Sequence, residues 1–255
     1  FCACVIILIS GFLLISRERI GERLLPWTRG RAAIDPLVHA PETFKEIALD
    51  LGKFVLLRAS LFAVAAAIIY QFGRGIFLAM MPIFYVQELG WTDISYSGLT
   101  GTATFVGGAV SILFGGLLLD FFGRTRAFQI LCVAAAALGV MLAVAPGLGD
   151  SDTVMKIYRV LYMTLDTLIT VAYIAIAMAI CARQVAATQF AIYMALSNVG
   201  YSAGSAAFGP LYESLASFEA VFLVFTGVVI AAAITMSQVR IADHIAKVRE
   251  LEADN

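Results

Sequence analysis

The sequence contains a succession of apolar stretches, each long enough to cross a lipid bilayer as a helix. An α-helix rises about 1.5 Å per residue, so about 20 apolar residues cross a hydrocarbon core of ~30 Å. Apolar residues make up 61% of the 255-residue chain and charged residues only 14%, and the mean hydropathy is +0.92. These values exclude an ordinary soluble domain and predict an all-α polytopic membrane protein.

The positions of the charged residues predict four segments. Residues 1–15 form the end of a membrane helix, and residues 16–53 form a cytoplasmic linker that ends in an amphipathic helix. That helix either lies on the membrane surface or packs on the protein's own cytoplasmic face. Residues 54–238 form a bundle of six membrane-spanning helices, and residues 239–255 form a tail. Because the chain begins inside an apolar run and without Met, we expect a missing N-terminal half to complete it.

The distribution of positive charge predicts the orientation of the chain. All but three of the 17 Lys and Arg residues fall in or beside segments that the helix order places on one side. Cytoplasmic loops are enriched in Lys and Arg, so this side and the C-terminus are predicted to be cytoplasmic. The exceptions are Arg74, Lys156 and Arg159. The net charge of −1 gives no support to nucleic-acid binding.

A charged segment interrupts the apolar pattern at Gly116–Arg126, which reads GLLLDFFGRTR. Ionised side chains are costly in hydrocarbon, so Asp120, Arg124 and Arg126 must lie at a water interface. Gly123 permits the tight turn that this position needs. An ordinary charged turn on the cytoplasmic side would explain the same residues, so the segment alone does not specify a function.

Two ionised residues, Arg74 and Asp166, lie near the middle of predicted spans. An Arg or Asp there costs about 2.5 to 3.5 kcal/mol on insertion scales, so each needs a partner or a water-filled cavity. An ion pair between them would offset part of this cost. The pair either belongs to a functional cavity or only fixes the register of two helices. Gly73, Gly75 and Pro82 predict that the helix around Arg74 is broken.

Polar side chains recur at helical spacing around both charges and face a common cavity in this interpretation. The candidate substrate-binding residues are Tyr70, Gln71, Arg74, Arg159, Tyr162 and Asp166. Two Arg side chains and one carboxylate leave an excess of positive charge, which favours an anionic solute. Asp166 is also the candidate for proton coupling, although burial and a neighbouring Arg have opposite effects on the protonation of a carboxyl group.

Patterns for catalysis, metal binding or cofactor binding are not evident in the sequence. The four cysteines lie in or beside apolar runs, where cysteine acts as a small packing residue. The two histidines, His39 and His244, lie in polar connecting segments. A membrane-embedded transferase would need clustered bases or metal-binding carboxylates near the interface, and we find no histidine placed for that role. We therefore expect no enzymatic activity, no metal and no cofactor.

The charged segment resembles the loop signature GxxxDxxGRxR of the major facilitator superfamily of transporters. The matching residues are Gly116, Asp120, Gly123, Arg124 and Arg126. The resemblance implies that the acid and the basic residues form a cytoplasmic charge clamp that locks neighbouring helices in one access state. It also implies that residues 54–238 are helices 7 to 12, the C-terminal half of a twelve-helix core.

A second resemblance begins at the inner turn that contains Cys181. This turn and the helix start at 187–191, which reads ATQFA, are similar to AmpG-type muropeptide permeases, whose group includes acetyl-CoA transporters. The resemblance implies proton-coupled symport of anhydro-muropeptides across the bacterial inner membrane. It further implies that the seventh and tenth helices line the cavity, which places Arg74 and Asp166 there.

Two departures from these permeases leave the substrate open. The permeases tend to read YKLGD where this chain has YQFGRG, with Gln71 and Arg74, and an acid–Asn-like pair is Asp166-Thr167 here. One alternative is a transporter of another organic anion, such as an acyl-CoA, a siderophore or a sugar-like solute. The other is a sensor or scaffold on the same fold that does not transport.

Overall fold

The computed structural model describes residue 11, residues 51–183 and residues 185–253. The predicted end of a membrane helix at 1–15, apart from Gly11, and the predicted linker up to residue 50 lie outside the described residues.

Helices account for nearly all of the described chain, and the described residues contain no strand. The elements are α3 (Arg58–Ile83), η1 (Phe84–Glu88), α4 (Asp93–Phe122), α5 (Arg124–Val144), η2 (Pro146–Asp150), α6 (Asp152–Ile180), α7 (Ala186–Leu215), α8 (Phe218–Met236) and α9 (Ile241–Ala253). The prediction of an all-α polytopic membrane protein is confirmed.

Five of these helices are long and apolar enough to cross a membrane: α3 with η1, α4, α5, α6 and α8. The sixth predicted span, α7, has 30 residues but lies outside this set. Its glycine, serine and asparagine residues make it less hydrophobic than the others. Small residues of this kind are typical of helices that pack closely on a neighbour.

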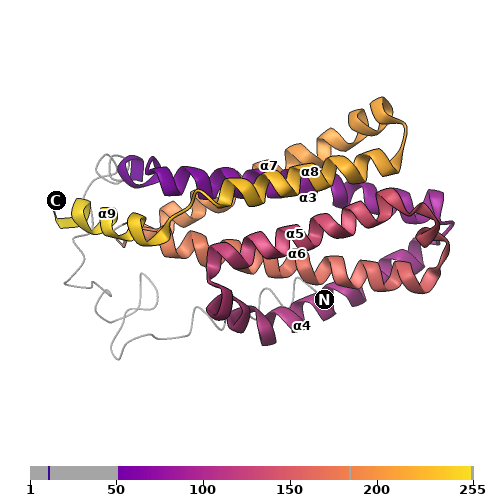
Figure 1. The fold of residues 1–255 in the computed structure, drawn as a ribbon, viewed down its shortest axis with the longest axis horizontal. Helices are drawn as coiled ribbons and strands as arrows, with labels where there is room; N and C mark the ends of the chain where they lie inside the picture. The colour runs from indigo at the N-terminus through magenta and orange to yellow at the C-terminus, as the bar shows by residue number, and fades with distance from the viewer. Residues whose placement is uncertain (1–10, 12–50, 184, 254–255) are drawn as a thin grey trace. The chain divides into compact units, whose positions relative to one another are not determined.

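The helices pack in a defined spatial order (Figure 1). Helix α3 packs between α7 and α8, α5 packs between α8 and α6, and α4 packs on α6. Contacts at the helix ends show that α3 and α6 are antiparallel. At one end, Phe54 clusters with Ala182 and Val248. At the other end, the Tyr85 hydroxyl donates a 2.8 Å hydrogen bond to the carbonyl oxygen of Met155.

Helix α3 is continuous through the predicted break. Residues 73–75 are helical, and the irregularity lies further along, at Pro82 and in the π-helical turn η1. Gly75 has a packing role instead, because a Cβ atom there would clash with the backbone of Tyr201. Helix α7 continues through Pro210 and ends at Leu215, and the next residue, Ala216, has a left-handed φ of 49°.

Glycines allow the α3 and α7 backbones to approach closely. A Cβ atom on Gly200 would lie 2.6 Å from the carbonyl oxygen of Ile68, and one on Gly204 would clash with the carbonyl of Phe72. In a membrane, where lipid removes much of the hydrophobic drive, such close packing stabilises helix pairs. The contact therefore holds α3 in position against α7.

Helix α4 is mostly exposed, and its glycines are only partly used for packing. Its apolar window is 17% buried, against 50% for α3 and for α6. Gly107 packs against the backbone of Met163 on α6, whereas Gly98, Gly101 and Gly108 have open space where a Cβ atom would lie. These three glycines therefore make no close contact within the described residues. Only one face of the helix contacts α6.

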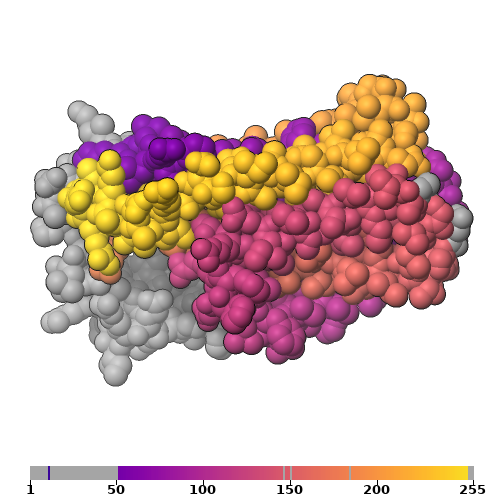
Figure 2. Space-filling model, viewed as in Figure 1, coloured from indigo at the N-terminus to yellow at the C-terminus, as the bar shows by residue number. Residues whose placement is uncertain are grey.

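The end of α6 is capped by side chains from α7 and α9. The Nε2 atom of His244 lies 2.8 Å from the carbonyl oxygen of Ile180, and Gln189 accepts a 2.8 Å hydrogen bond from the backbone N–H of Ala182. A carbonyl can only accept, so Nε2 of His244 is the donor. These bonds satisfy backbone groups that the end of a helix leaves unpaired. Figure 2 shows the C-terminal segment on the surface beside the start of α3.

We expect Gly204→Ala to lower the free energy of unfolding by about 1 to 3 kcal/mol, the usual effect of overpacking. The physical reason is the clash with Phe72, which neither backbone can relieve without separating α3 from α7. Gly209→Ala is the matched control, because the same helix has open space there. Thermal unfolding of both variants in detergent measures the difference. Equal stability of the two variants would contradict the packing role.

We expect the docking of α9 to weaken as the pH falls below 6.5. Burial lowers the pKa of His244 from its ordinary value of 6.5, and the hydrogen bond to Ile180 only partly opposes this effect. Below pH 6.5 the undocked helix therefore binds a proton that the docked helix does not, so docking is complete above this pH and is lost below it. Hydrogen exchange of the amides of 241–253 against pH measures the change.

The control for this experiment is His244→Gln, which keeps a side-chain donor near Ile180 but cannot titrate in this range. Its exchange, corrected for the intrinsic pH dependence, is expected to stay constant. The same pH dependence in both proteins would assign the effect to another group.

Candidate functional site

An ion pair joins α3 to α6 within the spanning region. The Nε atom of Arg74 lies 2.7 Å from Oδ1 of Asp166. The Asp166 side chain is 3% exposed and that of Arg74 is 25% exposed. Arg74 lies well inside α3 and Asp166 lies at the centre of α6. The predicted pair therefore exists in the structure, and each charge offsets the desolvation of the other.

A second donor from α3 binds the same carboxylate. The Tyr70 hydroxyl donates a 2.8 Å hydrogen bond to Oδ1 of Asp166. Tyr70 and Arg74 are four residues apart, so they lie on the same face of the helix. The guanidinium carbon of Arg74 also lies 5.3 Å from the centre of the Tyr201 ring on α7, within cation–π range. The site thus combines groups from three helices.

Aromatic side chains continue the site along α6. The Tyr162 ring stacks on Phe77 of α3, with ring centres 3.8 Å apart. Among the described residues, the buried hydroxyls of Tyr162 and Tyr158 have no hydrogen-bond partner, and neither has Oε1 of Gln71. Buried polar atoms are usually paired, so this group of atoms is a candidate for ligand contact.

Arg159 is the second basic residue of the site and is only 2% exposed. Its Nη2 atom donates a long, 3.4 Å hydrogen bond to the Thr100 hydroxyl, and its guanidinium carbon lies 5.4 Å from the centre of the Tyr96 ring. Its Nε and Nη1 atoms have no partner among the described residues. A buried guanidinium with free donors is costly, and an anion would stabilise it.

The structure brings three of the six predicted binding residues into direct contact: Tyr70, Arg74 and Asp166. Arg159 and Tyr162 lie on the same face of α6, and Arg159 is seven residues, or about 10 Å along the helix, from Asp166. Within the described residues the buried Oε1 atom of Gln71 has no hydrogen-bond partner, and Gln71 follows Tyr70 directly on α3. Sequence reasoning missed Thr100 and Tyr96, which lie on α4 and show no distinguishing pattern.

The charged segment forms the turn between α4 and α5. Gly123 separates the two helices and has a φ of 79°, which confirms the expected tight turn. Asp120, Arg124 and Arg126 are exposed, as an interface position requires. Among the residues described from 51 onward, no ion pair joins Asp120 to either arginine. Gly116 is also exposed, with open space where a Cβ atom would lie.

Within the described residues, no group of three or more His, Cys, Asp or Glu side chains is arranged to hold a metal ion. Cys132 and Cys181 are free thiols. The central site therefore offers charge pairing, hydrogen bonding and aromatic contact. Its geometry suits the binding of a charged solute within the spanning region.

The sequence model of the family described as Major Facilitator Superfamily matches residues 63–251, well over half of the chain. The chain belongs to the major facilitator superfamily. Proteins of this superfamily are transporters and not enzymes, which makes the chain a membrane transporter of unspecified substrate. No curated protein matches the sequence. The superfamily thus gives the class of activity, and the substrate must be inferred from the site.

We expect Arg74→Gln to lower the free energy of unfolding by about 3 kcal/mol or more, because it leaves the buried Asp166 carboxylate without its counter-ion. Adding Asp166→Asn should restore much of this loss, since the remaining group is then neutral. Thermal unfolding in detergent of the two single variants and the double variant measures the coupling. Strictly additive effects would show that the two side chains do not stabilise each other.

The control for this cycle is Lys156→Gln on α6. Lys156 pairs with Asp152 at 3.6 Å, but the two side chains are 55% and 71% exposed. Exposed pairs of this kind contribute little to stability, so the control is expected to leave the unfolding temperature nearly unchanged.

Proposed function

We propose that the complete protein is a secondary active transporter that couples the uptake of an anionic solute to protons. The support for an anionic solute is the balance of charge within the spanning helices. Arg74 and Arg159 contribute two positive charges and Asp166 contributes one negative charge. The single observation that carries the proposal is the buried Arg159 side chain, whose Nε and Nη1 donors have no partner among the described residues.

The length of the site favours an extended solute with an apolar or ring-shaped part. Arg159 and Arg74 lie at its two ends, and the stacked rings of Tyr162 and Phe77 lie between them. An anionic group of the solute binds Arg159, and its body contacts the aromatic rings. A second polar group reaches Arg74. Anhydro-muropeptides have this character, as do acyl-CoA, siderophore and sugar-like anions.

Proton coupling follows from competition for Arg74. When the anionic solute binds this guanidinium, Asp166 keeps the Tyr70 hydroxyl but loses its counter-ion. A buried carboxylate without a counter-ion is costly, and a proton neutralises it. Solute and proton therefore bind together, and both leave when the ion pair forms again. Asp166 is the coupling residue in this mechanism.

The turn between α4 and α5 is proposed as the gate. The turn resembles the loop signature of the superfamily at Gly116, Asp120, Gly123, Arg124 and Arg126. The exposed charges of the turn are available to pair with neighbouring helices in one access state. Pairing partners are expected in the N-terminal half of the protein, whose six helices would complete the cavity.

The proposed orientation places this gate and the C-terminus in the cytoplasm, in a bacterial inner membrane. The charges of the described chain support it, because the basic residues gather at one end of the bundle. That end carries Lys53, Arg58, Arg124, Arg126, Arg183, Arg240, Lys247 and Arg249. The opposite end carries mainly acidic residues, as the positive-inside rule expects.

We expect vesicles that contain the complete protein to accumulate a labelled anhydro-muropeptide or acyl-CoA when the external pH is lower than the internal pH. Asp166→Asn should abolish accumulation against a gradient but retain exchange of solute, because the carboxamide binds no proton.

Arg159→Gln should raise the half-saturating concentration about tenfold or more, since it removes charge-assisted hydrogen bonds. Uptake of labelled solute with and without a pH gradient measures each effect.

Lys156→Gln is the matched control for Arg159→Gln, because it removes a positive charge one turn away on an exposed face. A neutral disaccharide is the control solute. Equal uptake of the disaccharide would contradict the anionic specificity. Accumulation by Asp166→Asn at the normal level would contradict the coupling role of Asp166. The binding role of Arg159 is tested separately, by the half-saturating concentration of Arg159→Gln.

A further inference from the structure

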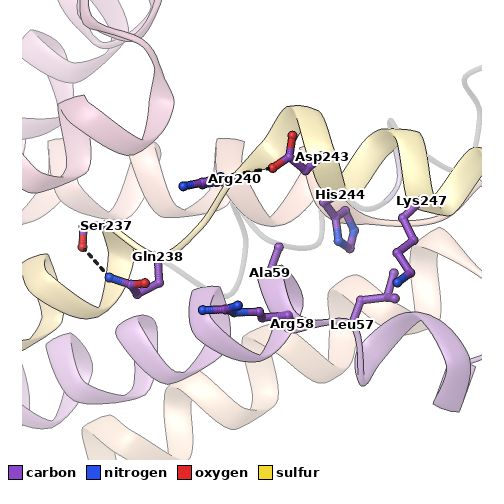
Figure 3. A pocket seen from close by; sticks show the side chains of 9 residues that line it. All are labelled: Leu57, Arg58, Ala59, Ser237, Gln238, Arg240, Asp243, His244 and Lys247. Atoms are coloured by element: carbon purple, nitrogen blue, oxygen red, sulfur yellow. Dashed lines mark hydrogen bonds and ion pairs between the residues drawn. The ribbon is translucent and has the colours of Figure 1, made fainter.

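A cavity of about 440 Å³ lies at the end of the bundle where α3 begins and α8 ends. The start of α3, the joint between α8 and α9, and one side of α9 form its walls (Figure 3). Sites for small molecules usually have volumes of about 300 to 1,000 Å³. Arg58, which lines the cavity, is 16 residues or about 24 Å along α3 from Arg74. The cavity is therefore separate from the central site.

Positive charge predominates on the cavity wall. Arg58, Arg240 and Lys247 line it, and Asp243 is the one acidic residue among the lining residues. Arg240 lies 3.8 Å from Asp243, but their side chains are 83% and 71% exposed, so this pair is weak. In Figure 3, His244 and Lys247 project from α9 toward the start of α3. The wall thus has a net excess of two positive charges.

The start of α3 adds a partial positive charge to the same wall. Residues Leu57, Arg58 and Ala59 line the cavity, and no side chain caps this end of the 26-residue helix. The first backbone N–H groups of a helix have no intrahelical acceptor, and the helix dipole makes this end favourable for anions. The uncapped end of α3 and three cationic side chains, Arg58, Arg240 and Lys247, thus face the same cavity.

We propose that this cavity binds a phosphate-class anion, supplied either by the headgroup of an anionic lipid or by a soluble phosphate compound. Several donors on different walls suit the oxygens of a phosphate better than a single carboxylate. The cavity lies at the ends of two spanning helices, which is the level of lipid headgroups. An anion bound there links α9 to α3 by bridging Lys247 and Arg58. The proposal does not depend on the transported solute.

The test is a ligand titration of the complete protein in detergent, followed by thermal unfolding. The probes are short-chain phosphatidylglycerol, short-chain phosphatidylcholine and inorganic phosphate, with chloride at matched ionic strength as the salt control. Phosphatidylglycerol is expected to raise the unfolding temperature in a saturable manner. Lys247→Gln and Arg58→Gln should each weaken the apparent affinity about fivefold, the effect of one basic residue at an anionic surface.

Arg249→Gln is the matched control, because Arg249 is an exposed basic residue on α9 that does not line the cavity. Lys247→Arg should keep the affinity, which guards against a variant that is merely misfolded. Saturation by phosphatidylglycerol alone assigns the site to lipid headgroups, and equal saturation by inorganic phosphate assigns it to soluble phosphates. Equal effects of phosphatidylglycerol and phosphatidylcholine, or of Lys247→Gln and Arg249→Gln, would overturn the proposal.

Discussion

The carboxylate of Asp166 places the strongest constraint on the bundle, because a charge at the centre of a spanning helix must be paired. Its two donors, Tyr70 and Arg74, both come from α3. Helix α3 packs mainly on α7 and α8, so its position relative to α6 is fixed largely by this polar contact and by the Phe77–Tyr162 stack. Helix α7 packs closely on α3 at Gly204, so the position of α7 depends on that of α3.

The all-helical membrane fold was predictable because its signals are local. Apolar length predicts the spans, and a glycine between charges predicts the turn at Gly123. The continuity of α3 through residues 73–75 was not predictable from local sequence, since glycines break some helices and let others pack closely. The same holds for Pro210, which lies inside α7. In each case packing on a neighbouring helix determines whether the helix continues. The sequence pattern of a single segment carries no information about that neighbour.

The candidate site was also predictable only in part. Helical spacing and the cost of buried charge identified Arg74 and Asp166 as partners, because two opposite charges at matching depth have few other solutions. The partners of Arg159, Thr100 and Tyr96, come from α4 and have no such signal. His244 was expected in a polar connection, yet it is buried and caps α6. A histidine in a short polar segment does not reveal a backbone carbonyl 64 residues earlier in the chain.

Arg74, Arg159 and Arg58 have the same side-chain chemistry. They differ in burial and in how many of their N–H donors have partners within the described residues. Arg74 has a carboxylate at 2.7 Å, so a ligand must compete for it, and this competition is what can couple two binding events. Arg159 is buried with unused donors, so a ligand gains contacts there without displacing a protein group. Arg58 is exposed and already solvated, so it attracts anions only together with its neighbours. The degree of unmet hydrogen bonding at a given burial is therefore what separates the roles proposed for Arg74, Arg159 and Arg58.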